Sequence, residues 1–198
     1  MKTKEKILKA AGQLFSQKGY AASSIREISK QCDVNIAAVN YHFNSKENLF
    51  HSVVKDHYQF LDQEISRVCE NASCIEECAI GIFRLFILHG DKVMMTFKFL
   101  MNESIEIEKS VLTTSSGSFG PPGNDQFIAL IKRCRPSINN QDAFFVMRNI
   151  LSIICHQSLI LSSKAFGQHL KNSKAYNLQS HEASLKRLTC TLLGSLDS

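Results

Sequence analysis

The fold is decided by residues 24–43, whose sequence is SIREISKQCDVNIAAVNYHF. Ser24 followed by Glu27 forms a capping-box pattern, in which the hydroxyl and the carboxylate satisfy two N–H groups at a helix start. Asp33 suits a tight turn, because aspartate tolerates left-handed backbone better than most residues. Asn35 can then cap a second short helix. Two short helices joined by a tight turn predict a helix-turn-helix, although an ordinary helical hairpin has the same spacing.

The second of these helices, expected over residues 36–42, should have one inward and one outward face. Val39 and Phe43 are four residues apart, so both should point into the core. The outward face then carries small, amide and aromatic side chains, at Ile36, Ala37, Asn40, Tyr41 and His42.

Residues 4–49 resemble the DNA-binding domain of the TetR/AcrR family of bacterial transcriptional regulators. The matching pieces follow one another in the order and separation found in the family: ILKAA (7–11), LF (14–15), KGY (18–20), SSIREI (23–28), YHF (41–43) and SKENLF (45–50). One departure is Asp33, where the family usually has glycine. Aspartate can adopt this turn at modest strain, so the motif survives.

By position in the motif, the resemblance implies DNA contacts at Ser23, Ser24, Arg26, Asn35, Ile36, Ala37, Asn40, Tyr41, His42 and Lys46. Hydroxyl and ring N–H groups donate to phosphate oxygens, and Lys46 adds a cation beside the positive end of its helix. Ile36, Ala37 and Asn40 face the groove floor, where asparagine can pair with adenine and an apolar side chain can touch a thymine methyl group. Arg26 could instead be merely solvated, and Asn40 could be an ordinary surface amide.

The charge distribution agrees with a DNA-binding N-terminal module. The chain has 198 residues, 44% hydrophobic and 21% charged, which is the composition of a globular protein. The net charge of +5 is concentrated in residues 1–48, which carry +4 and leave +1 for the other 150 residues. A basic module on a near-neutral body indicates contact with nucleic acid through the module alone.

Several features favour a cytoplasmic protein with no membrane partner. No apolar run of signal-peptide length follows the charged N-terminus. Arg84 interrupts the apolar stretch 79–88, so we expect no bilayer-spanning segment. The seven cysteines are odd in number and irregularly spaced, which argues for a reducing compartment rather than a disulfide framework.

Proline is absent from residues 1–120 and 137–198, and helical periodicity runs through both stretches. We therefore expect an all-α fold, with an N-terminal three-helix helix-turn-helix DNA-binding domain (1–48) and a C-terminal helical effector-binding and dimerisation domain (49–198). The expected helices cover residues 3–18, 24–32, 36–42, a long stretch from 45, 75–89, 92–109, 127–134, 141–166 and 180–196, with a mobile connector at 113–125.

The body resembles the family in helix order more than in residues. The resemblance implies that the helices at 141–166 and 180–196 form a homodimer interface, which palindromic DNA also demands. Their apolar faces could instead only fill the core of the monomer. The resemblance further implies an effector pocket between inner helices, for which we select Phe83, Phe86, His89, Phe97, Met101, Phe127 and His156. Aromatic rings and methionine with a few polar anchors suit a partly apolar cavity, although each ring could equally be plain core.

The sequence thus predicts a homodimeric, ligand-responsive transcriptional regulator, a repressor by resemblance, that a small and largely apolar effector releases from palindromic operator DNA. The alternative is a metal- or redox-sensing regulator using Cys69, Cys74 and Cys78. Cys74 and Cys78 are four residues apart and could share a helix face, but a closed zinc site needs four ligands and free cysteine is often simply buried.

We expect neither enzymatic activity nor a cofactor. The glycine-rich stretch GSFGPPG at 117–123 lacks the Gly-Lys-Ser/Thr ending of a phosphate-binding loop. No G-x-S-x-G or H-E-x-x-H motif occurs either.

Overall fold

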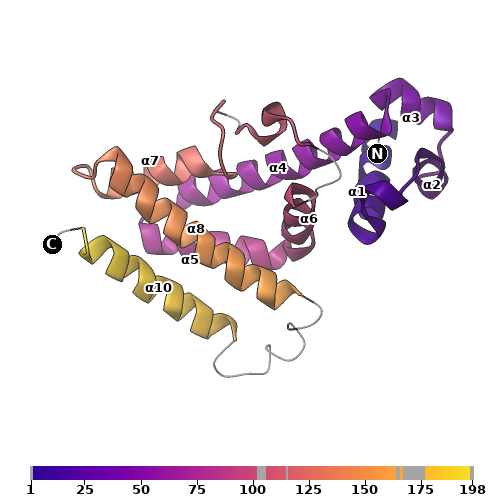
Figure 1. Cartoon of the computed structure of the whole chain (residues 1–198). Helices are drawn as coiled ribbons and strands as arrows, with labels where there is room; N and C mark the ends of the chain where they lie inside the picture. Colours follow the sequence, from indigo (N-terminus) through magenta and orange to yellow (C-terminus); the bar gives the residue numbers. More distant parts are fainter. Residues whose placement is uncertain (1, 102–105, 115, 164–165, 167–176, 197–198) are drawn as a thin grey trace. The chain divides into compact units, whose positions relative to one another are not determined.

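The computed structural model describes residues 2–101, 106–114, 116–163, 166 and 177–196. Every regular element in this part of the chain is a helix, which confirms the all-α prediction (Figure 1). The chain forms two compact units, Met1–Phe60 with Met95–Thr113, and Leu61–Met94 with Thr114–Ser198. The boundary expected at residues 48 and 49 is a functional division, and it stays a prediction.

The first unit contains α1 (Thr3–Ala22), α2 (Ile25–Gln31), α3 (Ile36–Phe43), the first part of α4 (Lys46–Asn71) and the end of α6 (Gly90–Leu100). α2 packs on α1 and on α3. The apolar stripe of α1 and the buried face of α3 meet α4 in one core, formed by Ile7, Ala11, Leu14, Phe15, Ile28, Val39, Phe43, Leu49, Phe50 and Val53.

The helix boundaries in this unit follow the local signals in the sequence. Regular helix in α1 stops at Gly19, whose φ of 82° takes it out of helical geometry, and one further turn continues to Ala22. Ser24 and Glu27 form the expected capping box on α2. Asp33 adopts a φ of 53° in the turn, and Asn35 caps α3.

A later segment of the chain joins the first unit, which the sequence did not indicate. Phe99 of α6 and Val111 are buried in the same core as the helix-turn-helix. Val111 belongs to a short 3-10 helix, η1 (Lys109–Leu112). The helix expected over residues 92–109 was wrong in its end, because α6 stops at Leu100; residues 102–105 lie outside the described part.

The second unit contains the rest of α4, α5 (Ile75–Leu88), α7 (Asn124–Cys134), α8 (Asn140–Ser162) and α10 (Leu178–Gly194). α5, α8 and α10 pack side by side (Figure 1). The core of the unit is apolar and includes Ile82, Phe83, Phe127, Leu130, Ile131, Val146, Met147, Ile150, Ile154 and Leu185.

Among the described helices, α8 is long and apolar enough to cross a membrane by length and composition alone. That test is also passed by core helices, and the buried face of α8 packs on α5, α7 and α10. Of its most apolar stretch, 39% is buried within the described part of the chain.

The connector expected at 113–125 is more ordered than its composition predicted. Thr114 Oγ1 donates to Asp125 Oδ2 at 2.9 Å, and the Ser116 hydroxyl donates to the same oxygen. The N–H of Thr114 also donates to the carbonyl of Ser118 at 2.8 Å. These hydrogen bonds fasten the connector to the first turn of α7.

Candidate nucleic-acid interface

The outward face of α3 is the centre of the candidate interface. Tyr41 is 83% exposed and Ile36 is 40% exposed, while Val39 and Phe43 on the opposite face are buried, as expected. The other outward residues are Ala37 and Asn40, which are exposed, and His42, which is half-buried. Exposed aromatic and apolar side chains beside an amide form a surface that can contact base edges and phosphates.

The turn before α3 is fixed by hydrogen bonds. The N–H of Val34 donates to the carbonyl of Ser29 at 3.0 Å, which closes the turn around Asp33. Asn35 Oδ1 accepts the N–H of Ala37 at 2.9 Å. The Asn35 oxygen therefore serves α3 as its cap, while the residue remains on the exposed surface expected to meet DNA.

The structure corrects the expectation for Ser23. The residue is 3% exposed, and its hydroxyl donates to the carbonyl of Gly19 at 2.7 Å. Its N–H donates to the carbonyl of Tyr20 at 3.2 Å. Both donors of Ser23 are thus used inside the protein, because the turn after Gly19 folds back on this residue.

Ser24 and Arg26, at the start of α2, are exposed as expected. Ser24 Oγ accepts the N–H of Glu27 at 3.2 Å. The ammonium group of Lys18 forms an ion pair with the Glu27 carboxylate, with 2.7 Å between Nζ and Oε1. The hydrogen bond from Lys18, together with that from Ser24, lowers the pKa of the Glu27 carboxyl, so this carboxylate stays charged within the capping box.

Lys46 lies at the first position of α4, which Ser45 caps by accepting the N–H of Asn48 at 3.0 Å. Its Nζ lies 4.3 Å from the centre of the Tyr20 ring and 3.4 Å from the carbonyl oxygen of Ala21. A cation next to the N–H groups at the start of a helix is a favourable phosphate site. Tyr20 was part of the matched motif, but its contact with Lys46 depends on tertiary packing and had no signal in the spacing.

The expected effector-pocket residues are divided between the two units. Phe97 and Met101 belong to the first unit, and Met101 is 75% exposed. Phe83 and Phe127 are completely buried in the core of the second unit, as is nearly all of Phe86. His89 is half-buried and His156 is exposed. Because α6 passes from one unit to the other, and because ring composition does not separate core from cavity lining, an effector pocket at these residues stays a prediction.

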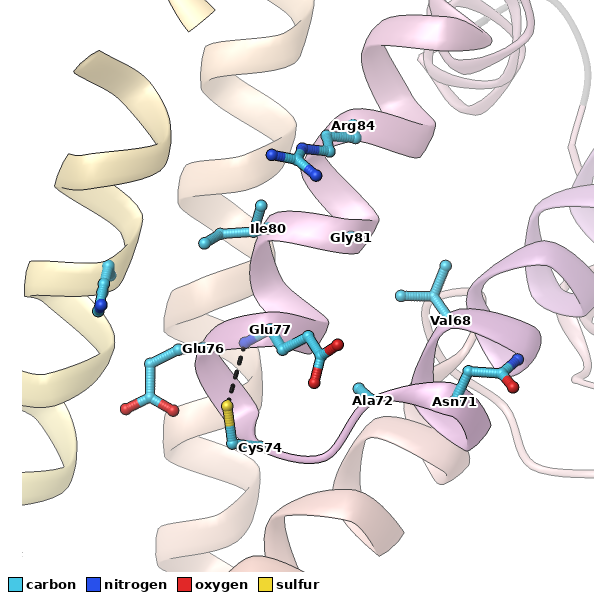
Figure 2. A pocket seen from close by; sticks show the side chains of 10 residues that line it. Val68, Asn71, Ala72, Cys74, Glu76, Glu77, Ile80, Gly81 and Arg84 are labelled. Carbon is cyan, nitrogen blue, oxygen red and sulfur yellow. Dashed lines mark hydrogen bonds between the residues drawn. The ribbon is translucent and has the colours of Figure 1, made fainter. Parts of the chain in front are cut away.

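A cavity of about 600 Å³ lies elsewhere in the second unit, open to solvent (Figure 2). It runs along α5, with α4 on one side and Lys186 of α10 among its other lining residues. The lining combines apolar and charged side chains; the lining residues are Val68, Asn71, Ala72, Cys74, Glu76, Glu77, Ile80, Gly81, Arg84 and Lys186. Arg84 is held by Glu182, with contacts of 2.6 and 3.0 Å.

The cysteines do not form the arrangement expected for a metal site. Cys74 is the N-cap of α5 and its sulfur accepts the N–H of Glu77 at 3.5 Å, so it does not share a helix face with Cys78. Cys78 is buried and its sulfur lies 3.3 Å from that of Cys69. This thiol contact, with burial, raises the pKa of Cys78 well above its usual value, which disfavours the thiolate form that binds metals. Among the described residues, no three His, Cys, Asp or Glu side chains lie where they could hold a metal ion.

The geometry of α1, α2 and α3, with an exposed third helix, defines a helix-turn-helix protein of the DNA-binding class. Residues 7–53 match the family model described as "Bacterial regulatory proteins, tetR family". Residues 7–53 therefore form a helix-turn-helix domain of the kind found in the TetR/AcrR family of transcriptional regulators. Regulators of this family are not enzymes.

Curated relatives match mainly over the N-terminal part. The chain is 38% identical over 71 residues to "Probable HTH-type transcriptional regulator YttP" of Bacillus subtilis, covering 36% of this chain and 34% of that protein. It is 26% identical over 113 residues to "HTH-type transcriptional repressor NicS" of Pseudomonas putida, covering 55% and 53%. The chain therefore spans between about a third and about half of the length of these two relatives.

Solved structures share the fold over almost the whole chain. A TerR/AcrR-family regulator from Aquifex aeolicus superposes with a TM-score of 0.65 at 21% identity, covering 96% of this chain and 99% of that one. The regulator FadR from Bacillus subtilis, solved in complex with stearoyl-CoA, superposes with a TM-score of 0.67 at 17% identity, covering 93% and 96%. At these identities the likeness establishes the fold alone.

Proposed function

We propose that this protein is a homodimeric transcriptional repressor that binds palindromic operator DNA through α2, α3 and the start of α4. The observation that carries the proposal is the exposed outer face of α3, where Ile36, Asn40 and Tyr41 point away from a fully packed inner face. A recognition helix must present base-reading side chains in this way. Repression rather than activation is supported by the similarity to NicS, which is named a repressor.

The proposed contacts fall into two groups. Ser24, Arg26, Tyr41, His42 and Lys46 donate to phosphate oxygens and fix the protein on the duplex, with no preference for sequence. The base-reading group is Asn35, Ile36, Ala37 and Asn40, of which Asn40 has the amide that can pair with adenine.

The proposed dimer interface is the outer surface of α8 and α10, within residues 141–166 and 180–196. Phe144 and Phe145 of α8 are large apolar side chains that are 44% and 39% exposed in the described part of the chain. Large exposed apolar patches usually mark an association surface. A second copy related by a two-fold axis would cover both helices and provide the second recognition helix that a palindrome requires.

We propose that the second unit binds a small, largely apolar effector. The 600 Å³ cavity along α5 lies within the usual size range of small-molecule sites, about 300–1,000 Å³. FadR, which has the same fold, was solved with stearoyl-CoA. α4 belongs to both units, so a shift of α4 on effector binding would change the separation of two recognition helices that must match about 34–36 Å of DNA.

Two measurements test the proposal. Selection from randomised duplexes should recover an inverted repeat with half-sites one helical turn apart, and a logo without two-fold symmetry would contradict it.

Light scattering after size exclusion should give a dimer that Phe145→Glu converts to monomer, because the charge would be buried in an apolar interface. Phe119→Glu, at an exposed residue outside both helices, is the matched control and should remain dimeric.

A ligand screen tests the effector step. Compounds that raise the melting temperature of the full chain are titrated with and without the selected operator. Because coupling is reciprocal, operator DNA should weaken effector binding by the same factor as the effector weakens operator binding, about 5–150-fold. Equal affinity with and without DNA would mean that the second unit is not a sensor.

Since the proposed partner of the protein is chromosomal DNA, we infer a cytoplasmic location.

A further inference from the structure

We propose that Tyr20 is a positioning residue that holds the ammonium group of Lys46 ready for a DNA phosphate. The inference rests on the proposed function, because it assumes that Lys46 contacts the DNA backbone. Tyr20 does not itself touch DNA in this proposal. It acts through the contact between its ring and Lys46 Nζ, which lie 4.3 Å apart.

The position of Tyr20 is fixed by the residue before it and by the core below it. Gly19 adopts a φ of 82°, a conformation that favours glycine, and this kinks α1 just before Tyr20. The Tyr20 ring then packs on Phe15 and Phe50, with centroid distances of 5.9 and 5.1 Å. Phe50 is itself held by Phe99 at 5.4 Å. Tyr20 is therefore a rigid aromatic platform at the edge of the first unit's core.

Lys46 is held from two directions. Its Nζ lies over the Tyr20 ring, and it donates to the carbonyl of Ala21 at 3.4 Å. The ring attracts the cation through its quadrupole, at a distance well inside the 6 Å range of such contacts. The amine keeps further N–H donors for a phosphate oxygen. Because a free lysine side chain has many rotamers, an ammonium group fixed in advance loses less entropy when the phosphate binds.

The charges around this contact agree with the proposal. Burial, followed by the charge of Glu47, raises the pKa of Tyr20, so the phenol remains neutral and its ring is the feature that Lys46 meets. The neighbouring cation, Lys18, forms an ion pair with Glu27 at 2.7 Å, so Lys18 does not compete with Lys46 for the face of the Tyr20 ring. Lys46 is half-buried at the start of α4, where N–H groups and the helix dipole also attract an anion.

The test is a double-mutant cycle on the full chain, with Tyr20→Leu, Lys46→Ala and both together. The probe is a fluorescent mixed-sequence duplex of about 30 base pairs, titrated over a range of salt concentrations. The slope of log K against log salt is negative, and Lys46→Ala should reduce its magnitude by about 0.9, the value for one phosphate contact. Tyr20→Leu should weaken binding about two- to fivefold, the fold-change that corresponds to an exposed cation–π contact of ~0.5–1 kcal/mol. In the Lys46→Ala background, Tyr20→Leu should have no further effect.

Two controls separate positioning from folding. Tyr20→Phe keeps the ring and should bind like the wild type. Phe99→Leu removes a ring from the same core without touching Lys46, and it should leave the salt slope unchanged. If Tyr20→Leu does not fold, Tyr20→Met fills a similar volume without a π face and replaces it in the cycle.

The outcomes are distinct. Equal weakening by Tyr20→Leu with and without Lys46, or tighter binding by Tyr20→Leu, would overturn the positioning role. Wild-type affinity and slope in Lys46→Ala would also overturn it, while DNA binding as such would stand. A wild-type protein that shows no salt-dependent binding to the duplex would overturn the proposed function and this inference together.

Discussion

The carboxylate of Asp62, in α4, accepts the backbone N–H of Gly123 at 2.8 Å in the interior of the second unit, where Asp62 is 1% exposed. Gly123 is the N-cap of α7 and adopts a φ of 74°. A Cβ at this position would lie 2.1 Å from Cγ2 of Ile65. Asp62 therefore ties the start of α7 to α4 at a point where only glycine allows the two helices to approach.

Removing this carboxylate should destabilise the protein. Asp62→Ala leaves the buried N–H of Gly123 without this acceptor, which lowers the free energy of unfolding by about 1–3 kcal/mol. For a chain of this size we expect the melting temperature to fall by about 2–4 °C for each kcal/mol. Asp56→Ala, on the exposed surface of the same helix, is the matched control and should melt like the wild type. Equal melting of the two variants would mean that the Asp62 contact adds nothing to stability.

Asn40 should read one base pair in each half-site. Asn40→Ala removes the amide that can pair with adenine, and it should cost on the order of 1–3 kcal/mol at that base pair and little elsewhere. Binding-site selection before and after the substitution measures the change. Tyr41→Phe is the comparison, since loss of a phosphate contact should weaken all sequences alike. An unchanged logo for Asn40→Ala would make this residue an ordinary surface amide.

The acid-side stability of the protein should depend on Asp125. Burial raises the pKa of this carboxyl, but hydrogen bonds from Ser116, Thr114 and Ser118 outweigh burial, so the pKa is lower in the folded state than its usual value. The stabilisation is therefore fully present above the unfolded carboxyl pKa of about 3.9 and is lost as the pH falls through the folded-state pKa.

Asp125→Asn tests this dependence. Below a pH of about 4, the melting temperature of the variant should fall less steeply with decreasing pH than that of the wild type. Asp142→Asn, which also lies in the first turn of a helix, gives a comparison at a carboxyl outside the connector. If the melting temperatures of the wild type and of Asp125→Asn fall equally steeply with decreasing pH, the proposed linkage is ruled out.

Features fixed by local chemistry could be predicted from the sequence. The capping box of Ser24 and Glu27, the helix stop at Gly19 and the turn at Asp33 each depend on residues a few positions apart. The inward positions of Val39 and Phe43 follow from helical periodicity in the same way.

Features that depend on long-range packing could not be predicted. The burial of Phe99 with the helix-turn-helix comes from a segment about fifty residues beyond that motif, and no local pattern indicates it. The contact of Cys69 with Cys78 requires α4 and α5 to pack together, while the spacing of Cys74 and Cys78 suggested another pair. Ser23 lies next to Ser24 in a matched motif, yet only the fold of the preceding turn buries it.

The close approach of α4 and α5 requires glycine at residue 81. A Cβ there would lie 2.6 Å from Cγ1 of Val68, so Gly81→Ala forces the valine or its helix to move. Overpacking of this kind costs about 1–3 kcal/mol. Alanine is favoured over glycine within a helix by about 1 kcal/mol, which is no larger than the smallest expected penalty. We therefore expect Gly81→Ala to lower the melting temperature in the wild-type background.

A second substitution should reverse the sign of this effect. Val68→Ala removes the methyl group that the new Cβ would meet, so only the helix-propensity gain of about 1 kcal/mol remains for Gly81→Ala in that background. Thermal melts of the two single variants and the double variant give the coupling free energy directly. Gly194→Ala, near the end of α10 with no atom within 4 Å of the added Cβ, is the control for propensity alone. If Gly81→Ala destabilises equally with Val68 and with Ala at residue 68, the contact with Val68 is not the reason for the glycine.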